Sequence, residues 1–167
     1  MGSYDDFLGI YKYIRNDEKL LRLLTLPPED LGTGIDDPLS PSLTNILDKD
    51  PEKISTIQNE HIMKSMKADD LENKKICRLY IYPGRRSPRS DSYYIASQEL
   101  VIDLFVHLDY ENGDFRTSRI NDRLNELIVD NHIAGASSMR YLEGSPRSAP
   151  RNYVGYESVF TFMTKKS

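Results

Sequence analysis

The run that most constrains the fold lies in the middle of the chain, where apolar residues occupy every second position. These residues are Leu100, Ile102, Leu104, Val106 and Leu108. A period of two is typical of a β-strand that turns one face toward a core. A second run of this kind spans residues 76–82, and no helical pattern separates the two runs. We therefore expect two antiparallel strands of one sheet.

Helical patterns lie on both sides of these strands. Apolar residues recur at helical spacing over residues 7–14 and again over residues 120–128. With Asn16 as a cap, the leucine-rich residues 20–24 are expected to form a second short helix or a bent continuation of the first, which ends before Pro27 and Pro28. Residues 112–114 are expected to turn the chain into the second helix, which should end near Gly135.

Two further strands are expected near residues 137–142 and 153–164, joined by a loop. The resulting order, α-β-β-α-β-β, predicts an α+β fold in which an antiparallel four-stranded sheet carries its helices on one face. The chain has 167 residues, which is the length of one domain. We therefore expect residues 1–167 to form a single domain.

A long irregular excursion is expected after the N-terminal helix, over residues 29–75. Its beginning has the composition of a loop, with Gly32, Gly34, Pro38 and Pro41. Helical spacing is weak in the rest, so only short turns of helix are expected at residues 45–47, 51–57 and 62–66. A long excursion within a compact domain often contacts partners.

Composition and charge exclude several classes of protein. A formal net charge of −4 does not support a general electrostatic grip on nucleic acid. No stretch approaches the ~20 apolar residues that span a membrane, and the first residues carry acids instead of a signal sequence. We therefore expect a protein that stays in a cytoplasm-like compartment. The single cysteine, Cys77, excludes an internal disulfide and is expected to be a buried thiol.

The search for catalytic chemistry finds no motif. Nucleotide-binding glycine patterns and the serine hydrolase elbow are absent from the sequence. Asp103 and His107 share a strand face and make a metal site with Asp109 conceivable, but a plain polar face explains them equally well. The calcium-loop pattern fails because Gly113 is the fifth residue of the segment instead of the sixth. We expect no enzymatic activity, no metal and no cofactor.

The candidate functional residues lie in two expected loops, over residues 83–92 and 144–151. The loops contain Arg85, Arg86, Arg89, Arg147 and Arg151, and Tyr93 and Tyr94 directly follow the first loop. Both residue types are enriched at protein interfaces, because they combine contact area with directional hydrogen bonds. The same mixture also binds phosphate or stacks on bases. Three interpretations stay open: a solvated hairpin tip, a protein interface and a nucleic-acid contact.

Several segments resemble the tail terminator, or tail completion, proteins of long-tailed bacteriophages, which are also described as head–tail joining or neck proteins. The N-terminal segment YKYIRNDEKLLRLL (residues 11–24) is similar to the opening helix of that family. The segment ADDLENKKICRLYIYPGRR (residues 68–86) is similar to the approach to its first strand. The family's order of elements is completed by the strand LVIDLFVHL (residues 100–108), the helix after it and the last strand YESVFTFMT (residues 156–164).

This resemblance implies a non-enzymatic subunit of a ring, usually a hexamer, on the head-proximal end of the tail tube. The implied partners are further copies of the chain, the tail tube protein and the head connector or stopper protein. Non-specific contact with DNA in the channel is a further expectation. The implied location is the head–tail interface of the virion, after assembly in the cytoplasm of the bacterial host.

Two other functions are weighed beside the terminator. A neck stopper or adaptor protein on the head side of the same joint is a small ring subunit too. A nucleic-acid-binding α+β module would need solvent-facing aromatic residues on the central strands, where Phe105 is the clear candidate.

Overall fold

The computed structural model describes residues 2–135 and 137–165, without the side chains of Ser92 and Tyr93. The α-helices and β-strands follow one another along the chain as α1 (Ser3–Arg15), α2 (Glu18–Thr25), α3 (Pro51–His61), β1 (Ile62–Met63), β2 (Cys77–Arg89), β3 (Ser92–His107), α4 (Leu108–Asp114), α5 (Arg116–Ile128), β4 (Arg140–Arg147) and β5 (Tyr153–Lys165). Short 3-10 helices, η1 (Ile46–Asp48) and η2 (Leu71–Asn73), interrupt the long connection before β2.

The strands form a five-stranded mixed sheet in the order β1-β2-β3-β5-β4. The pairs β2–β3, β3–β5 and β4–β5 are antiparallel, which confirms the α+β class and both expected hairpins. The prediction of a purely antiparallel four-stranded sheet is wrong, because β1 adds a fifth strand parallel to β2. β1 has two residues, Ile62 and Met63, and two residues are too few to show a period.

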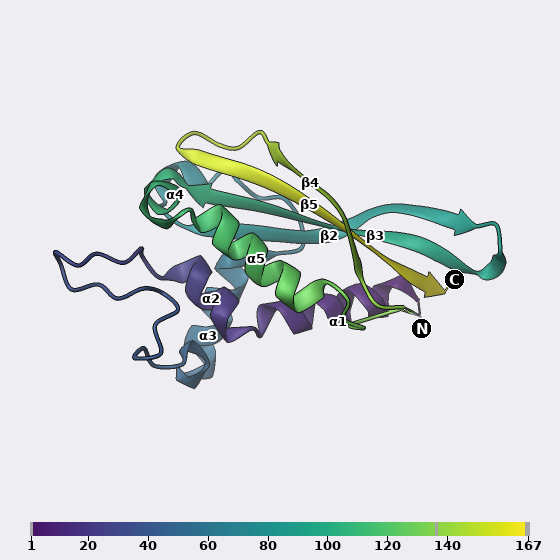
Figure 1. Cartoon of the computed structure of the whole chain (residues 1–167), viewed down its shortest axis with the longest axis horizontal. Coiled ribbons are helices and arrows are strands. Elements are labelled where there is room, and N and C mark those ends of the chain that lie inside the picture. Colours follow the sequence, from purple (N-terminus) through teal and green to yellow (C-terminus); the bar gives the residue numbers. More distant parts are fainter. Residues whose placement is uncertain (1, 136, 166–167) are drawn as a thin grey trace.

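The main core lies between one face of the sheet and the helices (Figure 1). The apolar residues of β3 at positions 100, 102, 104 and 106 belong to it, as the alternation predicts. They meet Leu20 and Leu24 of α2 and Leu124 of α5, all of which are fully buried. The prediction that the helices cover one face is therefore confirmed.

The opposite face of the sheet is covered by irregular chain. Leu71 of η2 packs there with Tyr80, Phe105 and Tyr153 in a second, smaller core. Arg78 fixes this cover, because its buried guanidinium donates to the carbonyl of Lys67 and to the Asp70 carboxylate. The excursion thus closes the second face of the sheet.

The expected excursion over residues 29–75 is more ordered than predicted. It contains η1, α3, β1 and η2, and the expected helical turn at residues 62–66 is replaced by β1. α3 begins with an N-cap: the Asp50 carboxylate accepts a hydrogen bond from the Glu52 N–H, and Pro51 is the first helical residue. The weak helical spacing of the apolar residues did not reveal the full length of this helix. Ile62 becomes a strand residue because Tyr11 and the sheet enclose it.

Three expected boundaries are wrong. Asp17, not Asn16, caps α2 by accepting from the Leu20 N–H at 2.9 Å. The expected turn at residues 112–114 is the end of a helix, α4, and the reversal occurs at Phe115 with φ 53. α5 ends at Ile128, well before Gly135, which takes φ +72 in the following loop.

The two expected loops are mostly strand. β2 continues to Arg89 and β3 begins at Ser92, so residues 83–92 form a ribbon with a tight turn. β4 spans Arg140–Arg147, later than the expected residues 137–142, so residues 148–152 alone connect it to β5. Proline and glycine within both segments gave the sequence its loop-like composition.

Candidate functional site

The ribbon of β2 and β3 projects beyond the rest of the sheet (Figure 1). Its strands change register between Pro83 and Arg86. Gly84 sits at this irregularity, where a Cβ would approach the Glu99 Cβ and a Val101 methyl to 2.9 Å. Glycine lets the two strands lie this close, and the ribbon is thereby directed away from the core.

The three ribbon arginines have different surroundings. The Arg85 side chain is exposed, and its backbone N–H donates to the Glu99 carboxylate at 3.0 Å. Arg86 is exposed and donates to the carbonyl of Lys165 at 2.8 Å. Arg89 forms an ion pair with Asp91 at 2.6 Å, and this contact lowers the pKa of Asp91. The arginines therefore do not converge on one anion, and Arg89 is already neutralised.

Not all of the other predicted site residues lie on the ribbon with these arginines. Tyr94 lies on the ribbon and is 79% exposed, whereas the side chain of Tyr93 lies outside the described residues. Arg147 pairs with Gly155 in the register of β4 and β5, while the ribbon reaches β5 at its other end, near Lys165. Arg151 is exposed in the β4–β5 turn. The structure thus separates Arg147 and Arg151 from the ribbon.

Arg147 instead completes a polar cluster on the outer face of the sheet. Asp103 is fully buried there, and it accepts hydrogen bonds from Arg147 and from the Tyr82 hydroxyl. Glu157 faces Asp103 across β3 and β5, and partial burial together with this carboxylate raises the pKa of Glu157. Burial and the bond to Asp103 raise the pKa of Tyr82 to about 12. The cluster holds β4 and β2 to the central strand.

A second projection is the loop after α2, at the far end of the molecule from the ribbon (Figure 1). It belongs to the expected excursion, but none of its residues was among the predicted site residues. Asp30 and Ile35 form an antiparallel bridge, with both backbone N–H···O distances at 2.9 Å. The Asp30 carboxylate also accepts from the Gly32 N–H, and Gly34 takes φ +75. Leu31, at the tip of this turn, is 89% exposed.

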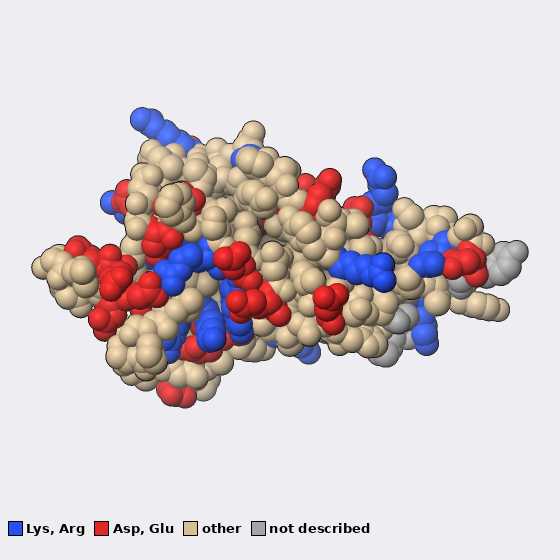
Figure 2. Space-filling view, in the orientation of Figure 1, with Lys and Arg blue, Asp and Glu red and all other residues tan. Residues whose placement is uncertain are grey.

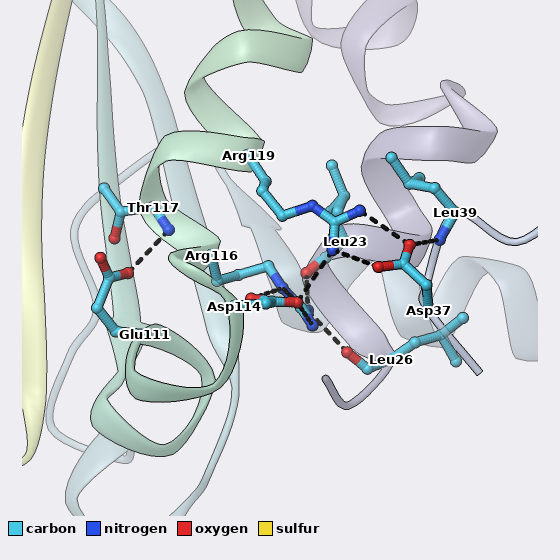
Figure 3. Close-up of polar contacts among 9 residues, drawn as sticks. All are labelled: Leu23, Leu26, Asp37, Leu39, Glu111, Asp114, Arg116, Thr117 and Arg119. Carbon is cyan, nitrogen blue, oxygen red and sulfur yellow. Dashed lines mark hydrogen bonds and ion pairs between the residues drawn. The ribbon is translucent and has the colours of Figure 1, made fainter. Parts of the chain in front are cut away.

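Arg116 and Asp114 fix the base of this loop (Figure 3). The Arg116 side chain is fully buried and donates to the carbonyls of Leu23 and Leu26 at 2.6 and 2.7 Å. Leu23 lies in the last turn of α2 and Leu26 is its C-cap residue, so these carbonyls have no helical partner. The Asp114 carboxylate forms an ion pair with the Arg116 guanidinium at 2.9 Å and so balances its charge.

Arg119 holds the other arm of the loop (Figure 3). Its guanidinium meets both oxygens of Asp37, at 2.8 and 2.9 Å, and also reaches Asp114 at 3.1 Å. Asp37 accepts in addition from the Leu39 N–H at 2.8 Å. The bond from Arg119 is the main reason why the pKa of Asp37 lies below its ordinary value. The loop is therefore anchored firmly on α5.

The two projections differ in charge. Residues 23–48 include five acids and no lysine or arginine, a signal that was open to sequence analysis. Figure 2 shows acidic side chains gathered at the end where this loop projects, whereas along the ribbon Lys and Arg side chains are mixed with fewer acidic ones. The chain thus presents an acidic end and a more basic end, although its net charge is only −4.

The described residues give little support for a metal site, a reactive thiol or a membrane-spanning helix. No group of three or more His, Cys, Asp or Glu side chains in them is arranged to hold a metal ion. Cys77 is buried, and burial raises the pKa of its thiol to about 12, so it is a poor nucleophile. Over the same part of the chain, every helix is too short or too polar to cross a membrane.

Comparison with known proteins identifies relatives of this chain. The model of the YomW family matches residues 17–162. The SPbeta prophage-derived uncharacterized protein YomW of Bacillus subtilis (strain 168) is 31% identical over 177 residues, which cover 98% of each chain. A relative in a prophage indicates a phage origin. The chain therefore belongs to the YomW family.

Proposed function

We propose that this protein is a phage tail terminator: a subunit of a ring, expected to be hexameric, that caps the head-proximal end of the tail tube and joins it to the head connector. The prophage-derived relative supports a phage role. The segment resemblances given above support the tail terminator in particular. In this proposal the protein is not an enzyme and acts through its surfaces.

The observation that carries the proposal is the presence of two unlike projections at opposite ends of one subunit (Figure 1). A ring of identical subunits in head-to-tail contact needs two different, complementary patches on each copy. The acidic turn with exposed Leu31 and the ribbon with exposed Arg85 and Arg86 are such a pair. A symmetric dimer would need one self-complementary patch instead.

The edges of the sheet favour contacts through side chains. β1 pairs with β2 only at Leu79 and Tyr80, and within the described residues no strand covers the outer side of β4. Pro83 and Pro88 lie on the part of β2 that β1 does not cover, and Pro146 lies on the edge strand β4. Because proline has no N–H, these residues limit the addition of a further strand and reduce uncontrolled aggregation.

A stopper or adaptor on the head side of the joint is the alternative that the same surfaces allow. A nucleic-acid-binding module has less support, because Phe105 is only 3% exposed and Tyr80 is fully buried. Neither ring can stack on a base while the second core is closed. If DNA passes through a ring, exposed Arg85 and Arg86 are suited to non-specific phosphate contact.

The test is mass measurement in solution together with negative-stain imaging, with and without the tail tube protein of the same phage. A terminator is expected to form rings, or to join the tube end as a ring, and to stop tube growth. A particle that stays monomeric in both conditions would contradict the proposal. Binding to the head connector without binding to the tube would identify a stopper.

A further inference from the structure

An apolar pocket lies between the N-terminal half of α1 and the edge of β2. Its volume is about 180 Å³. The side chains that line it on these two elements are those of Tyr4, Phe7, Leu8, Tyr11, Ile81 and Pro83. The pocket is open because β1 ends at Met63, after pairing with Leu79 and Tyr80, so within residues 2–135 and 137–165 no strand continues the sheet beside Ile81.

The rim of the pocket is basic. Lys64 is the one charged side chain among the described residues that line it. Its ammonium lies 4.6 Å from the centre of the Tyr11 ring, and none of the described carboxylates forms an ion pair with it. Beyond Pro83 the chain runs directly to Arg85 and Arg86, whose side chains are exposed. The pocket therefore suits an apolar group with negative charges beside it.

The acidic turn at the other end of the molecule carries an apolar side chain with negative charges beside it. Leu31 is 89% exposed, the highest value among the large hydrophobic side chains described. Glu29, Asp30 and Asp36 surround it in the sequence, and none of them has a cationic partner among the described residues. The turn is already closed by the Asp30–Ile35 bridge. Burial of Leu31 in a partner therefore requires little further ordering of the backbone.

We propose that Leu31 of one copy docks into the α1–β2 pocket of a second copy of this chain. In this contact the leucine fills the pocket, while Asp30 and Asp36 face Lys64 and the arginines of the ribbon. A charge match across an apolar centre gives both affinity and the correct register. The contact assigns a partner to the arginine ribbon.

The two surfaces cannot meet within one subunit, because the turn and the start of α1 lie far apart along the long axis (Figure 1). Each subunit consequently offers a free turn on one side and a free pocket on the other. Successive docking makes a head-to-tail series, which closes as a ring when the rotation permits. The inference rests on the proposed terminator function, for which it names the contact between neighbours.

Cysteine cross-linking tests the contact directly, even where it is short-lived. Native Cys77 is buried with a raised thiol pKa, so it does not compete for mild oxidants. Leu31→Cys protein is mixed with Leu8→Cys protein under oxidising conditions, and cross-linked peptides are identified by mass spectrometry. A disulfide between positions 31 and 8 is expected. The matched control pairs Leu8→Cys with Leu142→Cys, at an exposed site on β4, and should give a yield lower by roughly tenfold.

A second measurement uses complementary variants without cross-linking. Leu31→Asp removes the apolar tip, and Leu8→Glu places a charge in the pocket at a half-buried position. Each variant alone should self-associate more weakly by roughly tenfold or more. Their mixture retains one intact turn and one intact pocket per pair, so sedimentation should show a heterodimer and nothing larger. Leu142→Asp is the control and should associate like the unchanged protein.

The outcomes separate the inference from the proposed function. Rings that persist in the Leu31→Asp variant, or a 31–8 yield equal to the control, overturn the docking contact and leave the terminator intact. A specific 31–8 disulfide in a protein that forms open filaments and never joins a tail tube overturns the terminator and leaves the docking contact. Preferential cross-linking of position 31 to the tail tube protein would replace the second copy as occupant.

Discussion

At the scale of single residues, the most informative side chains are charges buried within the protein. Arg78 lies under the excursion, fully enclosed, and donates to the carbonyls of Glu60 and Lys67 as well as to Asp70. A buried guanidinium is tolerated only when its donors are satisfied and its charge is balanced. Asp70 supplies that balance, and Arg78 strongly lowers the pKa of this carboxyl.

Asp70→Asn is therefore expected to destabilise the protein by roughly 3 kcal/mol at neutral pH, because it leaves the Arg78 charge unbalanced. Urea unfolding measures this loss. Since the pKa of Asp70 is lowered on folding, its contribution is present above its ordinary pKa of 3.8 and disappears as the pH falls through the lower folded-state value. The difference between the variant and the unchanged protein should shrink at acidic pH. Asp69→Asn, an exposed neighbour, is the control and should change stability little at either pH.

Glycine positions give a second prediction at this scale. Gly135 takes φ +72, and a Cβ there would lie 2.2 Å from the carbonyl oxygen of Met163. Gly135→Ala should destabilise the protein by about 1–3 kcal/mol through strain and collision. Gly9, inside α1, has no atom within 4 Å of an added Cβ, so Gly9→Ala should stabilise by about 0.5–1 kcal/mol. Thermal unfolding of both variants checks the contrast, and a loss in both would show that α1 needs its glycine.

At the scale of elements, the ribbon can be tested by its charge. Replacement of Arg85, Arg86 and Arg89 by Ser should leave stability nearly unchanged, because these side chains are on the surface and the Arg89–Asp91 pair is exposed. Assembly, read by sedimentation and by negative-stain images, should be impaired. A matched variant with serine at three exposed lysines elsewhere, Lys19, Lys49 and Lys53, loses the same charge and should assemble normally. Normal assembly of the arginine variant would show that the ribbon is a solvated tip.

Sequence alone predicts the elements that have a strong period and misses those that depend on distant contacts. β3 and α5 are found because many apolar residues repeat, and the faces they bury are the predicted ones. β1 is missed because its two residues are in a strand only through their partners on β2. The ribbon is taken for a loop because Pro83, Gly84 and Pro88 are typical of turns, although an edge strand accepts them.

The candidate site is predictable only in part for a similar reason. Composition identifies the ribbon arginines, but it cannot show that Arg147 turns back to Asp103 across 44 positions. The sequence also groups Asp103 with an outward polar face, whereas the structure buries it completely. The exposure of Leu31 cannot be predicted from the sequence, because it depends on the turn that the Asp30–Ile35 bridge closes.

At the scale of the whole molecule, the unequal distribution of charge predicts how assembly responds to salt. The acidic turn and the basic ribbon attract through solvent, where the screening length falls from about 10 Å at 0.1 M salt to about 3 Å at 1 M. Association between copies should therefore weaken as salt rises, first through slower encounter. Sedimentation across a salt series measures this effect. Association that strengthens steadily with salt would indicate a contact governed by apolar burial alone.

The packing of α1 against β5 has a consequence for how the protein is made. The Asp6 carboxylate accepts from the Thr164 hydroxyl, 158 positions later in the chain, and the Phe7 ring packs on that of Phe162 at 5.9 Å. A nascent chain has α1 long before it has β5, so α1 can pack in its final position only after β5 has been made. Phe7 and Leu8 line the pocket from α1. A prematurely released chain that lacks β5 therefore has nothing for α1 to pack on, and we expect the proposed ring to exclude such a chain without a separate inspection step.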